Sequence, residues 1–186
     1  MTAKVVNEEF EVLKEVTQRL ERSRIPYMVT GSVALQTYAV PRMTRDIDVV
    51  VEIKENDVGK LLELFEKDYY IDAESIKEAV REKSMFNVIH NTHLVKVDLI
   101  VRKESEYREV EFARRQRTKV GDLNIWVVSP EDLLISKLWW AKDSLSSLQL
   151  GDAEKLLKEA TNMDLTYAER WIKVLGLQDL YLRVKR

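Results

Sequence analysis

Two acidic residues at the start of a predicted strand are the first candidates for chemistry. Asp46 and Asp48 open the apolar run 46–51, and side chains two apart on a strand point to the same face. Two carboxylates about 4 Å apart repel by roughly 4 kcal/mol at an effective dielectric of about 20. The pair therefore needs either a cation between its members or contact with water. In the second case, Arg42 and Arg45 would serve as counter-ions.

A third acid, Asp98, lies within the apolar segment 94–101. A carboxylate in such a strand is costly to bury unless it is paired or ligated, although an edge strand could expose it to water. Three carboxylates on neighbouring strands suit Mg²⁺, which prefers carboxylates together with substrate phosphates and water. We therefore expect Asp46, Asp48 and Asp98 to form a metal site for two Mg²⁺ ions, with Mn²⁺ as an alternative.

Upstream of these acids, Gly31 and Ser32 join a short predicted strand to a predicted helix. Glycine at such a turn allows the backbone to approach a ligand closely. The serine and the amides at a helix start can donate to phosphate oxygens. A turn with a helix cap is the commoner explanation of this dipeptide taken alone.

The combination resembles the signature of the DNA polymerase β-like nucleotidyltransferases: Gly31-Ser32, thirteen residues, Asp46-Ile47-Asp48, and a later strand aspartate, Asp98. Residues 31–35 and 42–48 are similar to the small prokaryotic branch, which includes abortive-infection (AbiEii-like) and antibiotic nucleotidyltransferases.

Residues 129–134, followed by Lys137 and Asp152, look like the helical motifs of the same branch. One departure is that residues 148–151 lack the basic side chains that often precede the aspartate there.

The resemblance implies a role for each matching position. Asp46 and Asp48 would bind both metal ions, and Asp98 would complete the second site and help to deprotonate the attacking hydroxyl. Gly31 and Ser32 would hold the β- and γ-phosphates. A last set of implied nucleotide-binding residues comprises Lys137, Asp152, Arg42 and Arg45.

The implied reaction moves a nucleoside monophosphate from an NTP to a hydroxyl or phosphate acceptor and releases pyrophosphate. The acceptor, whether a tRNA end, a protein or a small molecule, is left open by the sequence. The main alternative is a non-catalytic antitoxin or regulatory module of the same fold, acting through a protein partner. A glycosyltransferase also uses Asp-x-Asp, but does not normally need the Gly-Ser element or the third aspartate.

The elements that must position these residues follow from the hydrophobic pattern. The pattern predicts an α/β (α+β) fold with a mixed sheet flanked by helices: a catalytic domain over 1–128 and a helical subdomain over 129–186. The strand at 46–51 is expected to be buried on both faces. Helices are expected at 7–24, 33–38, 58–65, 73–81 and 104–115, and strands at 27–29, 46–51, 86–89, 94–101 and, as a hairpin, 118–128. Ser129-Pro130-Glu131-Asp132 predicts a capped helix start.

Composition narrows the function classes further. The 186 residues carry 30 basic and 32 acidic side chains, so no global positive field favours a long nucleic acid. There are no cysteines, which excludes disulfides and thiolate chemistry. No signal peptide or membrane span is evident, and we expect a cytoplasmic protein that does not bind membranes.

Two histidines and the basic cluster 114–119 are interpreted as turn and surface residues. An apolar face on the helical half could support a homodimer.

Overall fold

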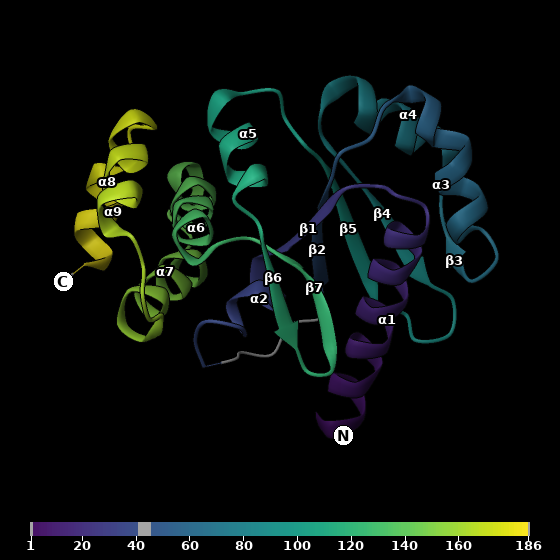
Figure 1. Ribbon diagram of the computed structural model, residues 1–186, viewed down its shortest axis with the longest axis horizontal. Helices are drawn as coiled ribbons and strands as arrows, with labels where there is room; N and C mark the ends of the chain where they lie inside the picture. Colours follow the sequence, from purple (N-terminus) through teal and green to yellow (C-terminus); the bar gives the residue numbers. More distant parts are fainter. Residues whose placement is uncertain (1, 41–45, 186) are drawn as a thin grey trace.

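A mixed β-sheet forms the centre of the computed structural model, which describes residues 2–40 and 46–185 (Figure 1). The elements within these ranges are α1 (Thr2–Arg22), β1 (Tyr27–Thr30), α2 (Gly31–Leu35), β2 (Asp46–Val51), a short 3-10 turn η1 (Glu55–Asp57), α3 (Val58–Phe65), β3 (Tyr69–Tyr70), α4 (Ala73–Glu82), β4 (Met85–His90), β5 (Lys96–Val101), α5 (Glu106–Ala113), β6 (Gln116–Val120), β7 (Leu123–Val127), α6 (Pro130–Ser144), α7 (Ser147–Glu159), α8 (Leu165–Val174) and α9 (Gln178–Val184).

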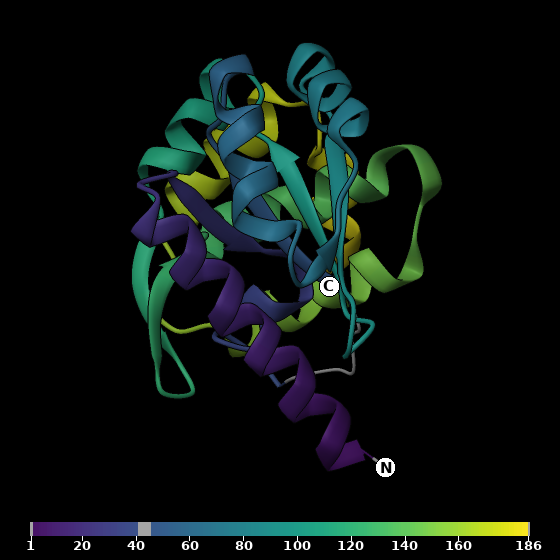
Figure 2. The same cartoon turned by 90° about the vertical axis from the view of Figure 1, so that its right-hand side faces the viewer.

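The strand order across the sheet is β3-β4-β5-β2-β1-β7-β6. Strands β2 and β5 are parallel, as are β1 and β7, whereas the other neighbouring strands are antiparallel. In both views the sheet lies between α1, α3 and α4 on one side and α6 to α9 on the other (Figures 1 and 2). The mixed α/β fold expected from the sequence is confirmed.

Strand β2 differs from the prediction in its burial. Ile47, Val49 and Val51 are buried in the core, whereas Asp46 is exposed and Asp48 and Val50 are only half-buried. The prediction that this strand is buried on both faces was therefore wrong. One face carries the hydrophobic residues of the core, and the other is left partly open where the acids lie.

Most element boundaries agree with the sequence pattern. Strand β2, helix α3 and the start of α6 lie where they were predicted. Strand β5 begins at Lys96 rather than at 94, because Leu94 has a positive φ of 53° and is 76% exposed in the turn after β4. No helix within the described residues is long and apolar enough to cross a membrane.

The start of α6 is fixed by a buried cap. The backbone amide of Asp132 donates to Ser129 Oγ at 3.2 Å, and that hydroxyl donates in turn to Asp132 Oδ2 at 2.7 Å. Pro130 occupies the first helical turn, where its missing amide hydrogen removes no helical bond. The predicted helix start is confirmed in detail.

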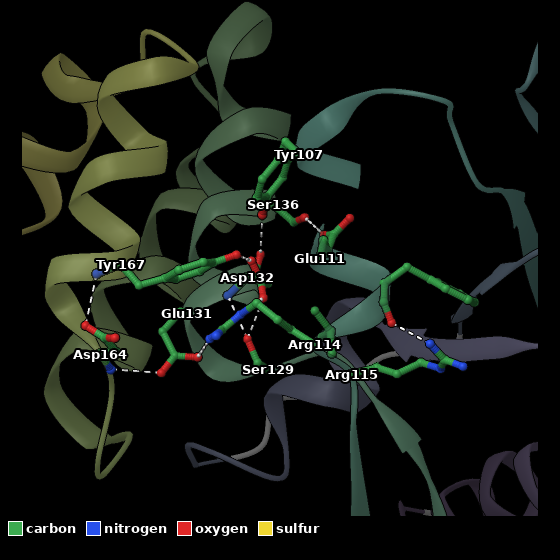
Figure 3. A network of polar contacts seen from close by, with 12 residues as sticks. Tyr107, Glu111, Arg114, Arg115, Ser129, Glu131, Asp132, Ser136, Asp164 and Tyr167 are labelled. Atoms are coloured by element: carbon green, nitrogen blue, oxygen red, sulfur yellow. Dashed lines mark hydrogen bonds and ion pairs between the residues drawn. The ribbon is translucent and has the colours of Figure 1, made fainter. Parts of the chain in front are cut away.

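A polar network ties this cap to α5 and α8 (Figure 3). Arg114, at the end of α5, donates to Asp132 Oδ2 and to Glu131 Oε2, each at 3.1 Å. Tyr167 on α8 donates to Asp132 Oδ1 at 2.7 Å and stacks on the Arg114 guanidinium, 3.7 Å from the ring centroid. Since Asp132 is fully buried, its carboxylate depends on the Arg114 guanidinium and on the hydroxyls of Tyr167 and Ser129. The network therefore fixes the orientation of the helical half against the sheet.

Replacing Tyr167 by phenylalanine should weaken this attachment. Hydrogen bonds to charged groups contribute about 1.5–3 kcal/mol, and we expect Y167F to lower the free energy of unfolding by about that amount in urea denaturation. Tyr70 is 65% exposed, so Y70F is the matched control and should change stability by less than about 0.5 kcal/mol. Equal stability of the two variants would contradict the proposed role of the network.

Candidate active site

The register between β2 and β5 brings the three predicted acids onto one face of the sheet. Asp46 lies beside Lys96, and Asp48 lies beside Asp98, on adjacent parallel strands. Because side chains two apart on a strand share a face, these residues occupy four neighbouring positions on the sheet. Three of the four positions are acidic and the fourth is a lysine.

Exposure falls across this acidic face. The Asp46 side chain is 54% exposed, whereas the Asp98 side chain is 8% exposed. Asp48 lies half-buried between these extremes. The face therefore runs from solvent into the interior, and its inner carboxylate cannot depend on water for compensation.

The Lys96 ammonium lies between two of the acids. Its Nζ is 3.0 Å from Asp98 Oδ2 and 3.6 Å from Asp46 Oδ1. These contacts, with the Asp98 hydrogen bond as the main cause, raise the pKa of Lys96 above its ordinary value. The lysine is a cation between Asp46 and Asp98, rather than between Asp46 and Asp48, the pair for which a cation or contact with water was expected.

Asp48 is held in a less favourable environment. Burial and the negative charge of Asp98 raise its pKa to about 6, although the positive charge of Lys137 acts in the opposite direction. A carboxylate with this pKa still ionises near neutral pH. It would gain considerably from an additional cation nearby.

Gly31 allows Asp48 to occupy its position. The glycine has a positive φ of 65°, and a Cβ built on it would lie 1.9 Å from Asp48 Oδ2. Thr30, the preceding residue, is the partner of Asp48 in the pairing of β1 with β2. Any side chain at position 31 would therefore displace the carboxylate. The next residue, Ser32, is buried in α2.

The helical residues implied by the family resemblance form a buried ion pair. Lys137 Nζ on α6 lies 2.8 Å from Asp152 Oδ2 on α7, and their side chains are 4% and 2% exposed. The lysine is also close enough to act on the charge of Asp48. The structure thus brings Lys137 to the acidic face with Asp152 as its partner. Arg42 and Arg45 lie outside the described residues.

The three acids can be compared with what Mg²⁺ requires. Among residues 2–40 and 46–185, no three His, Cys, Asp or Glu side chains form a metal site as they stand, and Lys96 lies between two of the acids here. Asp98 Oδ1, however, is buried without a hydrogen-bond partner in the described structure. The atoms that could bind a metal ion here are all carboxylate oxygens. An orphaned oxygen in an all-carboxylate set fits a hard cation such as Mg²⁺ or Mn²⁺.

Sequence reasoning missed two features of this site. Lys96 is two residues from Asp98, as Asp46 is from Asp48. The alternation of side chains along a strand therefore predicts that Lys96 and Asp98 lie on the same face. The pairing of Lys137 with Asp152 spans two helices, and nothing in the sequence indicates that contact. The interpretation of both histidines as turn residues was wrong for His90, which is the buried last residue of β4 and follows the strand partner of Lys96. Its Nε2 lies 3.6 Å from Glu15 Oε2 on α1, and its Nδ1 accepts from the amides of Thr92 and His93 in the following turn.

A family model matches most of the chain. It is described as a nucleotidyltransferase of unknown function (DUF6036) and covers residues 4–146. No curated protein matches the chain in sequence.

Several solved structures have a similar fold. The antibiotic-resistance factor ANT(2'')-Ia aligns with a TM-score of 0.63 at 11% identity, over 98% of this chain and 96% of that protein. The lincosamide antibiotic adenylyltransferase LnuA, in its lincomycin-bound form, gives a TM-score of 0.55 at 16% identity, with 81% and 94% covered. An antigenic nucleotidyltransferase-like protein from Paracoccidioides brasiliensis gives 0.54 at 17%, with 95% and 92% covered. Identities this low support the fold alone.

Substituting Gly31 should separate backbone strain from contact with Asp48. G31A should destabilise the protein by more than the roughly 1–2 kcal/mol that a left-handed conformation costs an alanine, because the methyl group must also displace the carboxylate. Gly176 has a φ of 66° with open space around its Cβ position, so G176A should cost the conformational penalty alone. Equal losses for the two variants in urea unfolding would show that the contact with Asp48 is unimportant.

Because the pKa of Asp48 is raised, removing its carboxylate should increase the stability of the fold, by an amount that depends on pH. In the unfolded chain Asp48 loses its proton near pH 3.8, whereas in the folded protein it keeps the proton up to about pH 6. The native state therefore loses stability as the pH rises through this range. In chelator, D48N should therefore be more stable than the wild type at pH 8, by up to about 3 kcal/mol. The advantage should shrink as the pH falls toward 4. Urea midpoints across this range test the prediction, and a variant that is less stable at pH 8 would contradict it.

Proposed function

The chain belongs to the nucleotidyltransferase family DUF6036, and from that premise we propose that it transfers a nucleoside monophosphate from an NTP and releases pyrophosphate. The acceptor is a hydroxyl or phosphate group. The single observation that carries the proposal is the acidic face, on which Asp46, Asp48 and Asp98 lie on adjacent strands in register. A reaction that consumes NTP fits the cytoplasmic setting expected from the sequence.

Divalent cations complete the proposed site. Asp46, Asp48 and Asp98 would hold Mg²⁺ or Mn²⁺, and the bound cations would neutralise charge on the transferred phosphate and on pyrophosphate. The orphaned Asp98 Oδ1 supports this assignment. So does the raised pKa of Asp48, since a nearby cation would lower it.

The protein's own residues align the reaction. The acceptor oxygen attacks the α-phosphorus, and the bond from that phosphorus to the bridging oxygen breaks as pyrophosphate leaves. Asp98 receives the proton of an acceptor hydroxyl. Gly31 and Ser32, the first two residues of α2, hold the β- and γ-phosphates. Holding both reactants in line contributes more to the rate than covalent chemistry by the protein.

Lys137 and Asp152 have a supporting role in this proposal. Their ion pair is buried, so the lysine is fixed rather than free to follow a substrate. Its charge moderates the repulsion between Asp48 and the other acids. We propose that the pair keeps α6 and α7 positioned beside the nucleotide and that Arg42 or Arg45 contacts its phosphates.

The proposed activity can be measured with each of the four α-labelled NTPs and Mg²⁺ or Mn²⁺. The acceptor arms are tRNA, a protein extract and small molecules, including lincomycin because LnuA was solved with it bound. Label transfer with stoichiometric pyrophosphate release is the expected result. A wild-type protein that transfers nothing and shows no metal-dependent heat with NTP would instead support a non-catalytic module.

Substitution of the acids gives the residue-level prediction. D46N and D98N should each lower the transfer rate by about 100-fold or more, the usual loss when a group that stabilises transition-state charge is removed. Asp122 lies in the β6–β7 turn and its side chain is 70% exposed, so D122N is the matched control and should keep full activity. Circular dichroism confirms folding of each variant. Undiminished transfer by D46N or D98N would contradict the proposal that these acids form the active site.

A further inference from the structure

Lys96 is the one basic residue among the four positions of the acidic face. Its ammonium donates to Asp98 Oδ2 at 3.0 Å and lies 3.6 Å from Asp46 Oδ1. The lysine side chain is 35% exposed. It therefore compensates two of the three carboxylates while remaining in contact with solvent.

A metal ion and this ammonium would compete for the same carboxylates. Mg²⁺ binds carboxylate oxygens at about 2.0–2.1 Å and dehydrates only for well-placed ligands. An ion shared by Asp46 and Asp98 would lie in the space that the Lys96 ammonium occupies between them. Two cations so close together in a partly buried site repel strongly. The ion pairs of Lys96 and a metal bound by these two acids therefore exclude one another.

The two lysines near the acids differ in their freedom to move. Lys137 is 4% exposed and its ammonium is paired with the buried Asp152, so moving it would leave a charge uncompensated in the interior. Lys96 differs because its flexible stem can carry the ammonium into water. The arriving metal ion then compensates the buried Asp98 in its place. Of these two lysines, Lys96 is therefore the one that a metal ion can displace.

We propose that Lys96 is a displaceable counter-cation, which holds Asp46 and Asp98 together in the metal-free protein and moves away when the metal ion binds. This inference rests on the proposed function, since it concerns the same site. It adds a residue that sets metal affinity. The free protein keeps its acids assembled, and part of the metal's binding free energy is used to displace the lysine. The released ammonium then adds positive charge beside the site.

The test measures Mn²⁺ affinity without nucleotide, from the electron paramagnetic resonance signal of free Mn²⁺. K96M should bind Mn²⁺ roughly two- to fivefold more tightly than the wild type, the factor expected when a competing, partly exposed ion pair is lost. K96R keeps the charge and should stay near the wild type. Lys77 forms a surface pair with Glu74, so K77M is the control for loss of a distant positive charge and should leave the affinity unchanged.

The outcomes separate the inference from the proposed function. If neither the wild type nor K96M binds Mn²⁺, the metal-dependent function fails and the inference fails with it. If the wild type binds Mn²⁺ and K96M binds it no more tightly, only the inference is overturned.

A second measurement needs no variant and therefore covers the case in which K96M does not fold. Amine acylation of the wild type, mapped by mass spectrometry, should increase at Lys96 when Mn²⁺ is added, relative to Lys77, whose side chain is 57% exposed. Unchanged or reduced labelling at Lys96 would overturn the inference.

Discussion

The parallel pairing of β2 with β5 is the constraint on which the rest of the site depends. It sets Asp48 directly beside Asp98 and Asp46 beside Lys96. The buried residues of both strands, including Val49 and Leu99, alternate with the site residues and fix this register. A slip of one residue would turn the acids into the core. The energy that holds like charges together therefore comes from apolar burial on the opposite face.

Charge compensation at the acidic face is divided between a fixed and a movable lysine. Lys137 comes from α6 and is locked to Asp152, whereas Lys96 comes from the sheet itself and reaches solvent. The fixed charge is positioned by the buried Ser129–Asp132 cap and by Arg114, which hold α6 in place (Figure 3). The network at the start of α6 thus connects the helical half to the electrostatics of the site, without touching the acids.

The sequence was sufficient where chemistry and local pattern coincide. The acids, the glycine turn and the serine cap carry their signals in residue type and short spacing, and β2 lies at its predicted bounds. It was insufficient where the outcome depends on contacts between distant segments. The burial of β2 was predicted wrongly because Val50 belongs to an apolar run although its face is only half-covered. The pairing of Lys137 with Asp152 joins separate helices, which no periodicity records. The expected division of the chain into a catalytic domain over 1–128 and a helical subdomain over 129–186 stays a prediction.

The central claim is that Asp46, Asp48 and Asp98 jointly form a divalent metal centre for a nucleotide. The most direct measurement is anomalous diffraction from crystals grown with Mn²⁺ and a non-hydrolysable NTP analogue. The account predicts an anomalous peak within coordination distance of all three carboxylates, with the triphosphate beside Gly31. A peak elsewhere, or no peak at the acids under saturating Mn²⁺, would contradict it.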